Sequence, residues 1–227
     1  MITIVLFDAS IEIPPLEIRN HPAIVNDAKR RGRDVDQILL YLPKHRFAMG
    51  KLDNFEKRGR PDITHRSLLL ILDSPLNKLG FLKILVSTIN NEVFEFSPEV
   101  RLPKDFYQFE GLMVQLLKTG VVPPNGKPLI WKVSKSLNEV LEECDYKALF
   151  SENGRMITYE DWKKIIKSKS AILIGAFQKG EISKQIYELA DDVFSISKFP
   201  LMTTTVVCRV LAYLEITASN EGIISEL

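Results

Sequence analysis

Cysteine is scarce in this sequence: Cys144 and Cys208 are the only two among 227 residues. Both lie in apolar segments and they form no Cys-x-x-Cys pair, so the sequence supports neither a disulfide scaffold nor a zinc site. The three histidines, His21, His45 and His65, are also far apart, and no Gly-x-Ser-x-Gly motif accompanies them. Hydrolase triads therefore have little support. We expect a protein of a reducing compartment that holds no metal.

Long apolar runs and an excess of one charge are missing as well. The longest apolar runs, such as residues 68–72 and 171–177, are too short to cross a bilayer, and a predicted strand without a basic leader begins the sequence. Lys and Arg number 30 against 29 Asp and Glu, so any polyanion would have to bind a local basic patch. The charge balance neither implies nor excludes nucleic acid. We expect a soluble, cytoplasmic protein without membrane partners.

The hydrophobic pattern predicts one α/β domain. Hydrophobic residues make up 45% of the chain, enough for a substantial core. Residues 2–7 form a continuous apolar run, which is typical of a strand buried on both faces. Residues 81–88 and 92–96 are predicted to form a β-hairpin, because Asn90 and Asn91 tolerate the positive φ of a tight turn. This hairpin would be an insertion in a parallel sheet.

Predicted helices and strands alternate through the rest of the sequence. Residues 106–117 have the clearest amphipathic helical spacing. Residues 67–72 resemble a buried helix that Asp62 or Thr64 would cap, whereas residues 35–55 show no clear period. Beyond residue 129, strand-like segments (129–133, 146–150, 171–177 and 193–196) alternate with helical segments (137–141, 158–166, 181–189 and 201–214). This alternation predicts a parallel sheet flanked by helices.

Two turns that follow predicted strands are the most informative part of the sequence. They lie in residues 174–180 and 195–201. Because ligands of open α/β sheets bind where loops leave the carboxyl ends of neighbouring strands, the two turns predict one shared pocket for a nucleotide or nucleoside. Gly175 and Gly180 have the spacing of a P-loop, but Glu181 follows where that motif needs lysine, so an ordinary nucleoside triphosphatase is not indicated. Glycines in a purely structural strand-to-helix turn would look the same.

Charged residues near two predicted helix starts are candidates for binding an anion. Asp62 could fix the guanidinium of Arg60 for bidentate contact with a phosphate or a base edge. A simple helix cap beside an exposed arginine would give the same residues. Arg101 and Lys104 flank a proline at the next helix start, where backbone amides already attract anions. A solvated, charged helix start is the alternative there.

Several motifs that are weak individually occur here in one order. They are residues 60–65 (RPDITH), 72–78 (LDSPLNK), 101–103 (RLP), 111–117 (GLMVQLL), 175–176 (GA) and 197–201 (SKFPL). Together they closely resemble the ribosome-biogenesis pseudouridine methyltransferases of the SPOUT class, and the similarity runs over nearly the whole chain.

The resemblance implies a fold and an activity. The fold would be a single SPOUT-type α/β domain over residues 1–227, with a parallel sheet, a hairpin insertion around residues 80–100, and a deep trefoil knot within a cofactor-binding part around residues 129–217. The protein would be a homodimer that uses S-adenosylmethionine to methylate N1 of a pseudouridine in a loop of small-subunit ribosomal RNA. A non-catalytic RNA-binding assembly factor that keeps the fold is the alternative.

The resemblance also implies roles for individual residues. Those matched to cofactor contacts are Phe150, Gly175, Gly180, Glu181, Ile182, Ile196, Ser197, Lys198, Phe199, Pro200 and Leu201. Those matched to RNA contacts are Arg60, Asp62, Arg101, Lys104 and Gln108. Lys104 and Gln108 stand where relatives often have arginine, which changes the phosphate contact because lysine lacks the guanidinium fork and glutamine lacks the charge. Asp62 is the candidate general base for the N1 proton.

Overall fold

One mixed sheet organises the protein. The structure, a computed structural model, describes residues 1–224, so residues 225–227 of the predicted domain lie outside the described part. The strands are β1 (Ile2–Ala9), β2 (Leu82–Thr88), β3 (Val93–Phe96), β4 (Val121–Val122), β5 (Ile130–Lys132), β6 (Tyr146–Met156), β7 (Ser170–Gly175) and β8 (Asp192–Ser195). Within residues 1–224 they form one sheet in the order β4-β5-β3-β2-β1-β7-β6-β8.

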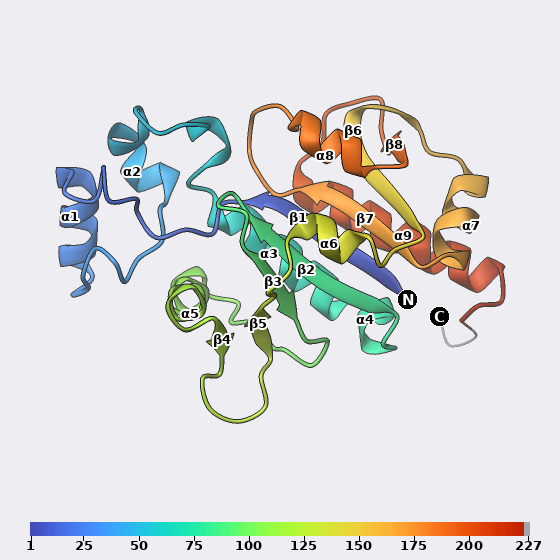
Figure 1. The fold of residues 1–227 in the computed structure, drawn as a ribbon, viewed down its shortest axis with the longest axis horizontal. Coiled ribbons are helices and arrows are strands. Elements are labelled where there is room, and N and C mark those ends of the chain that lie inside the picture. Colours follow the sequence, from blue (N-terminus) through green and yellow to red (C-terminus); the bar gives the residue numbers. More distant parts are fainter. Residues whose placement is uncertain (225–227) are drawn as a thin grey trace.

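Helices cover both faces of this sheet and one of its ends (Figure 1). They are α1 (Pro22–Arg30), α2 (Leu42–Met49), α3 (Pro61–Asp73), α4 (Pro75–Lys78), α5 (Phe106–Thr119), α6 (Leu137–Leu141), α7 (Tyr159–Lys167), α8 (Lys184–Leu189) and α9 (Thr203–Asn220), with a short 3-10 helix at Phe55–Lys57. The predicted helices and strands are therefore confirmed, apart from the boundaries and details described below.

Strand β1 is the centre of the sheet and contributes to two hydrophobic cores. Because side chains alternate along a strand, Ile4 and Leu6 face a core that includes residues of α3, α5, α7 and α9. Val5 and Phe7 face a second core built with residues of α6 and α8. A strand that is buried on both faces needs a continuous apolar sequence, and residues 2–7 have one.

The parallel and antiparallel parts of the sheet are separate. Strands β2, β1, β7, β6 and β8 pair in parallel, whereas β3, β5 and β4 form an antiparallel end. The predicted hairpin is confirmed by the pairing of β2 with β3, and Asn91 in its turn has φ of 61°. The prediction that residues 129–133 belong to the parallel sheet is wrong. The short connection 123–129 favours an antiparallel return, since a parallel one needs a longer crossover.

Two local predictions also need correction. Neither Asp62 nor Thr64 caps α3: Pro61 occupies its first turn, Arg60 is the N-cap residue, and no side-chain cap bond forms there. Cys208 is exposed on α9, because Val207 and Leu211 face the core instead. A knot in the path of residues 129–217 stays a prediction.

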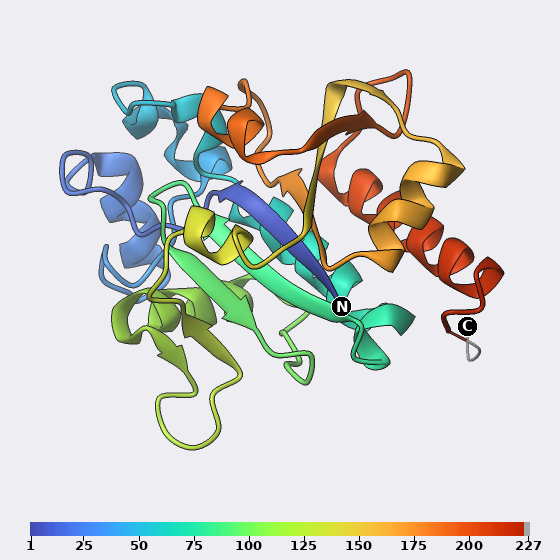
Figure 2. The same ribbon diagram turned by 45° about the vertical axis from the view of Figure 1, so that its right-hand side comes forward.

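The first two helices form an extension, and only for the second, α2, did the sequence leave the type of structure open. Both ribbon views show α1 and α2 at one end of the molecule, near α5 (Figures 1 and 2). The extension has a small core of its own, which includes Ile24, Ile38 and Met49. Helix α2 lies within the aperiodic segment 35–55, so its burial comes from packing against α1 rather than from an amphipathic pattern.

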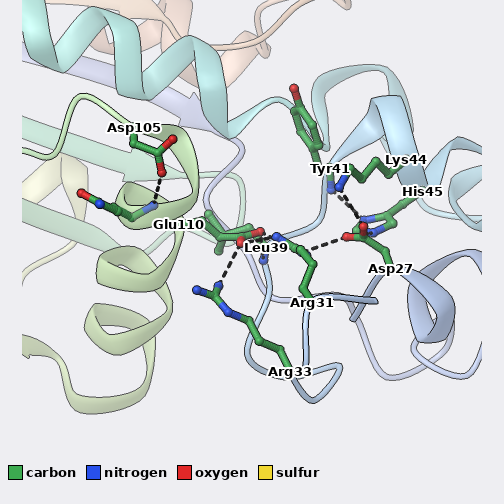
Figure 3. Close-up of polar contacts among 10 residues, drawn as sticks. Asp27, Arg31, Arg33, Leu39, Tyr41, Lys44, His45, Asp105 and Glu110 are labelled. Carbon is green, nitrogen blue, oxygen red and sulfur yellow. Dashed lines mark hydrogen bonds and ion pairs between the residues drawn. The ribbon is translucent and has the colours of Figure 1, made fainter. Parts of the chain in front are cut away.

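Buried charges join this extension to α5 (Figure 3). Glu110 of α5 has no exposed surface and accepts hydrogen bonds from Arg31 Nη1 (2.5 Å), Arg33 Nη1 (3.1 Å) and the backbone N–H of Leu39 (3.1 Å). Arg31 also lies 2.8 Å from Asp27. Removing one member of such a cluster is costly, because it leaves the other buried charges without compensation.

We expect Glu110→Gln to lower the free energy of unfolding by about 3 kcal/mol, the lower end for breaking a buried pair, since Arg31 and Arg33 keep some contact with water. Urea denaturation at neutral pH measures this loss. Asp36→Asn is the matched control, because the pair of Asp36 with Lys118 is exposed on both sides and its removal should change stability far less. Equal losses in the two variants would contradict the structural role of Glu110.

Candidate functional site

A cavity lies at the carboxyl ends of β6, β7 and β8. Its volume is about 610 Å³, within the range of small-molecule sites. The loop after β7, residues 176–182, forms one wall, and the loop after β8, residues 196–201, forms another. The two turns that the sequence singled out therefore do line one shared cavity, here called the first cavity.

Most residues predicted to contact a cofactor line the first cavity. They are Phe150, Gly175, Gly180, Glu181, Ile182, Ile196, Ser197, Phe199 and Leu201. Lys198 and Pro200 belong to the same loop but are absent from the cavity lining. The cofactor-contacting roles of all these residues stay predictions.

A bulge in β6 contributes residues that the sequence analysis missed. Phe150 and Arg155 both pair with Phe194 of β8, so the residues between them leave the ladder. Ser151, Glu152 and Asn153 in this bulge line the first cavity. In the sequence, the polar stretch Ser-Glu-Asn-Gly after a buried strand could have indicated these residues. Other lining residues not predicted are Ile174, Phe177, Gln178, Lys179, Tyr187, Phe194, Ser195, Thr203 and Val206.

The glycine turn after β7 is hydrogen-bonded to both β1 and α9. The N–H of Ala176 donates to the carbonyl of Phe7 at 2.8 Å, and the hydroxyl of Thr203 at the start of α9 donates to the carbonyl of Gly175 at 2.9 Å. A Cβ on Gly175 would lie 2.7 Å from the ring of Phe177. Position 175 therefore requires glycine because the ring of Phe177 approaches it closely. Gly175 also lines the first cavity.

Gly180 ends the same loop for a different reason. Its φ is 114°, a conformation that L side chains rarely adopt, and the stem of Lys57 packs beside it. Lys57 also binds the carboxylate of Asp8 at 2.8 Å and lies over the ring of Phe177, with its Nζ 4.9 Å from the ring centre. The loop after β7 thus rests on the segment that precedes α3.

Arg60 and Asp62 form a bidentate ion pair beside the first cavity. The Nε of Arg60 donates to Asp62 Oδ1 at 2.7 Å and its Nη2 donates to Oδ2 at 2.9 Å, which raises the pKa of the guanidinium. The Nη1 of Arg60 donates to the side-chain oxygen of Gln178, which lines the first cavity. The structure thus shows a guanidinium that Asp62 fixes, and not the simple helix cap that was the alternative interpretation of these residues.

Asp62, in the first turn of α3, is buried. Its exposed fraction is 6%, and both carboxylate oxygens accept hydrogen bonds from Arg60. Asp62 also lines a second cavity of about 340 Å³. The second cavity is lined by Tyr41, Asp62, His65, Arg66, Leu69, Lys104, Phe106 and Tyr107.

The predicted RNA-contacting residues are thus only partly brought together. Asp62 and Lys104 share the second cavity, and Arg60 lies beside them. Arg101 and Gln108 are exposed outside both cavity linings. The backbone N–H of Gln108 donates to Asp105, which caps α5. The structure therefore gives Gln108 a local role in the helix start, and its predicted RNA contact stays untested.

Within residues 1–224, no group of three His, Cys, Asp or Glu side chains has an arrangement that could hold a metal ion. None of the helices in that part of the chain combines the length and apolar character that crossing a membrane requires.

The fold and the first cavity define an α/β protein with a ligand site at the carboxyl edge of its parallel strands. The EMG1/NEP1 methyltransferase family model matches residues 4–215. The chain belongs to this family.

Curated relatives and a solved structure agree with this assignment. The ribosomal RNA small subunit methyltransferase Nep1 of Saccharolobus solfataricus is 41% identical over 93% of this chain and 95% of that protein. The Nep1 of Staphylothermus marinus is 39% identical over 92% and 93%. The crystal structure of Archaeoglobus fulgidus Nep1 bound to S-adenosylhomocysteine is 33% identical, covers 96% of this chain and 98% of that one, and has a TM-score of 0.87.

We expect Gly154→Ala to destabilise the β6 bulge by about 2 kcal/mol, because the added Cβ would overlap the backbone of Phe194 and the strands would have to separate. Thermal unfolding measures this change. Gly50→Ala is the matched control, since Gly50 has an ordinary helical conformation and its Cβ would meet nothing within 4 Å. A Gly154 variant as stable as the Gly50 variant would contradict the described bulge.

Proposed function

We propose that this protein transfers a methyl group from S-adenosylmethionine to N1 of a pseudouridine in small-subunit ribosomal RNA. The observation that carries the proposal is the first cavity, which both predicted cofactor loops line and which the Arg60–Asp62 pair adjoins through Gln178. The names of the Nep1 relatives and the S-adenosylhomocysteine bound to the Archaeoglobus fulgidus protein support it.

The first cavity suits an adenosyl group in both size and chemistry. Its lining combines residues of the loops after β7 and β8 with aromatic residues, among them Phe150 and Phe177. Backbone groups can recognise the edge of a flat, uncharged base, and aromatic rings can pack on its face. When bound, S-adenosylmethionine supplies a sulfonium methyl group, which N1 of pseudouridine accepts as the carbon–sulfur bond breaks.

The proposed RNA contacts lie beside this cavity. Arg60 is held by Asp62 on one edge and by Gln178 on another, so its planar guanidinium is fixed in direction before RNA binds. A fixed fork of N–H donors suits the carbonyl oxygens of a base or a phosphate group. Lys104, on the far side of the pair, is exposed and suited to a phosphate of the same strand.

We further propose that Asp62 serves methyl transfer by orienting Arg60. Both of its oxygens accept from Arg60, and the second lone pair of each oxygen can still accept an N–H of the RNA base. The proton of pseudouridine N1 has to leave as the N–CH₃ bond forms, and a carboxylate near the base or water can take it. The target nucleotide would be unpaired and turned out, because a duplex hides this edge.

The proposal includes a homodimer with a cytoplasmic location. Helices α3 and α9 pack against each other and leave large apolar side chains exposed, among them Leu70 of α3, Ile216 of α9 and Met202 just before α9. An exposed apolar surface of this kind favours a second copy of the chain. The predicted knot over residues 129–217 would bring the two cofactor loops together within each copy.

Methyl transfer from labelled S-adenosylmethionine to a short RNA loop tests the activity. We expect label in a loop that contains one pseudouridine and none in the same loop with uridine, because uridine has carbon where pseudouridine has its N1 nitrogen. Transfer to both RNAs would point to another nucleoside target. RNA binding without transfer to either would favour the assembly-factor alternative.

We expect Arg60→Ala to lower the rate of RNA methylation by at least tenfold while leaving the affinity for S-adenosylmethionine within about twofold, because Arg60 adjoins the first cavity without lining it. Single-turnover assays give the rate and calorimetric titration gives the affinity. Arg46→Ala is a control, since Arg46 is an exposed arginine of α2 outside the lining of both cavities. Equal losses of methylation and cofactor affinity in Arg60→Ala would contradict this assignment.

A further inference from the structure

Apart from Asp62 in its wall, the second cavity takes no part in the methyl transfer proposed above. It is smaller than the first, and its wall contains the aromatic side chains of Tyr41 and of the neighbouring residues Phe106 and Tyr107. Tyr41 and Phe106 lie with ring centres 5.0 Å apart, and Phe106 meets Tyr107 edge-on at 5.8 Å. Aromatic walls of this kind accept flat, unstacked rings.

The ring of Tyr107 is held in place from the side of the extension. Arg31 lies 5.3 Å from its centre and the ammonium of Lys44 lies 5.2 Å from it. Both cations belong to the buried charge cluster with Asp27 and Glu110 shown in Figure 3, in which the ring of Tyr41 points away from the cluster. Tyr107 nevertheless keeps 43% of its surface exposed, so it is both fixed and accessible.

The charges around the second cavity favour an anionic ligand. Asp62 pairs with Arg60 at 2.7 Å and also lies 3.7 Å from Arg66, and Lys104 is a further cation at the cavity, so the cations outnumber this carboxylate. Burial lowers the pKa of His65, so this residue is neutral at pH 7; its Nε2–H donates to the carbonyl of Pro103 at 2.7 Å. Tyr41 is protonated, because burial and the nearby Asp62 raise its pKa. The cavity therefore offers aromatic faces, a buried acceptor in Asp62, and a cationic rim.

We propose that the second cavity binds one unpaired nucleotide adjacent to the target pseudouridine in the same RNA strand. Its base would pack against the aromatic wall, its N–H or amino group would meet the buried carboxylate of Asp62, and its phosphate would meet Arg66 and Lys104. The inference rests on the proposed function, because it needs an RNA strand whose target nucleotide enters the first cavity.

Adjacency follows from the position of the Arg60–Asp62 pair. Arg60 contacts Gln178 in the wall of the first cavity, and Asp62 is in the wall of the second. This one ion pair thus contacts the walls of both cavities, so neighbouring nucleotides of one extended strand could occupy both. A volume of about 340 Å³ is at the lower end for ligand sites and suits a single nucleoside rather than a peptide or a longer RNA segment.

An abasic scan tests the site. Short single-stranded RNAs carry the pseudouridine and one abasic nucleotide, placed in turn at each flanking position, and their affinities for the intact protein are measured with S-adenosylhomocysteine present. We expect one flanking position at which loss of the base weakens binding about tenfold, within the range of stacking one base on an aromatic side chain. Methyl transfer to the unmodified pseudouridine RNA is measured alongside.

The matched variants are Tyr107→Ala, Tyr107→Phe and Tyr159→Ala. Tyr107→Ala should bind the intact RNA about tenfold more weakly and should no longer distinguish the intact RNA from the abasic RNA at the sensitive position. Tyr107→Phe keeps the ring and should behave as the unchanged protein does. Tyr159 of α7 is exposed to a similar extent outside both cavities, so its variant should show the full abasic loss. Thermal unfolding compares the folded state of each variant.

The outcomes separate this site from the proposed function. Two results would overturn the second site alone, provided that the pseudouridine RNA is methylated. One is that the losses of RNA affinity caused by Tyr107→Ala and by the abasic nucleotide multiply in full. The other is that no flanking position is sensitive to loss of its base. A change of oligomeric state in Tyr107→Ala, with RNA affinity unchanged, would show that a second copy covers the cavity and would also overturn it. An RNA neither bound nor methylated by the unchanged protein would overturn both proposals.

Discussion

Pairing between the central strand β1 and strand β7 fixes where the first cavity forms. Phe7 stands opposite Gly175 at the end of this pairing, and the N–H of Ala176 continues the hydrogen bonding to the carbonyl of Phe7. Beyond this point the two strands no longer pair with each other: Asp8 has φ of 50°, and the loop after β7 turns toward α9. The parallel register therefore determines where the glycine loop leaves the sheet, and the first cavity opens at that edge.

The segment before α3 connects this edge to the surface proposed to bind RNA. Lys57 binds Asp8 and lies over Phe177, and Arg60 contacts Gln178. Each contact joins residues of the loop proposed to hold the cofactor, or of the adjoining end of β1, to residues just before α3. The ion pair with Asp62 and the bond to Gln178 share one planar guanidinium, so Arg60 connects α3 to this loop.

The extension formed by α1 and α2 supports the same surface through buried charge. Glu110 forms ion pairs with Arg31 and Arg33, and Asp27 forms ion pairs with Arg31 and Lys44. Burying these ions costs desolvation energy, so the cluster is weak evidence for high stability and stronger evidence for a defined arrangement of α5. Because Arg31 and Lys44 also flank the ring of Tyr107, the cluster orients an aromatic side chain of the second cavity.

The sequence by itself determined the strand that is buried on both faces, the hairpin at Asn91, the amphipathic helix α5 and the shared pocket of two turns, because each depends on a local period or on backbone freedom at a few residues. Only the tertiary structure decided the antiparallel return of β5, the helical form of α2, the bulge in β6 and the burial of Asp62. These features depend on partners far away in the chain: Gln178 approaches Arg60 across 118 positions, and Glu110 approaches Arg31 across 79. No local pattern encodes such contacts, since they form only when the packing of the sheet and helices brings their elements together.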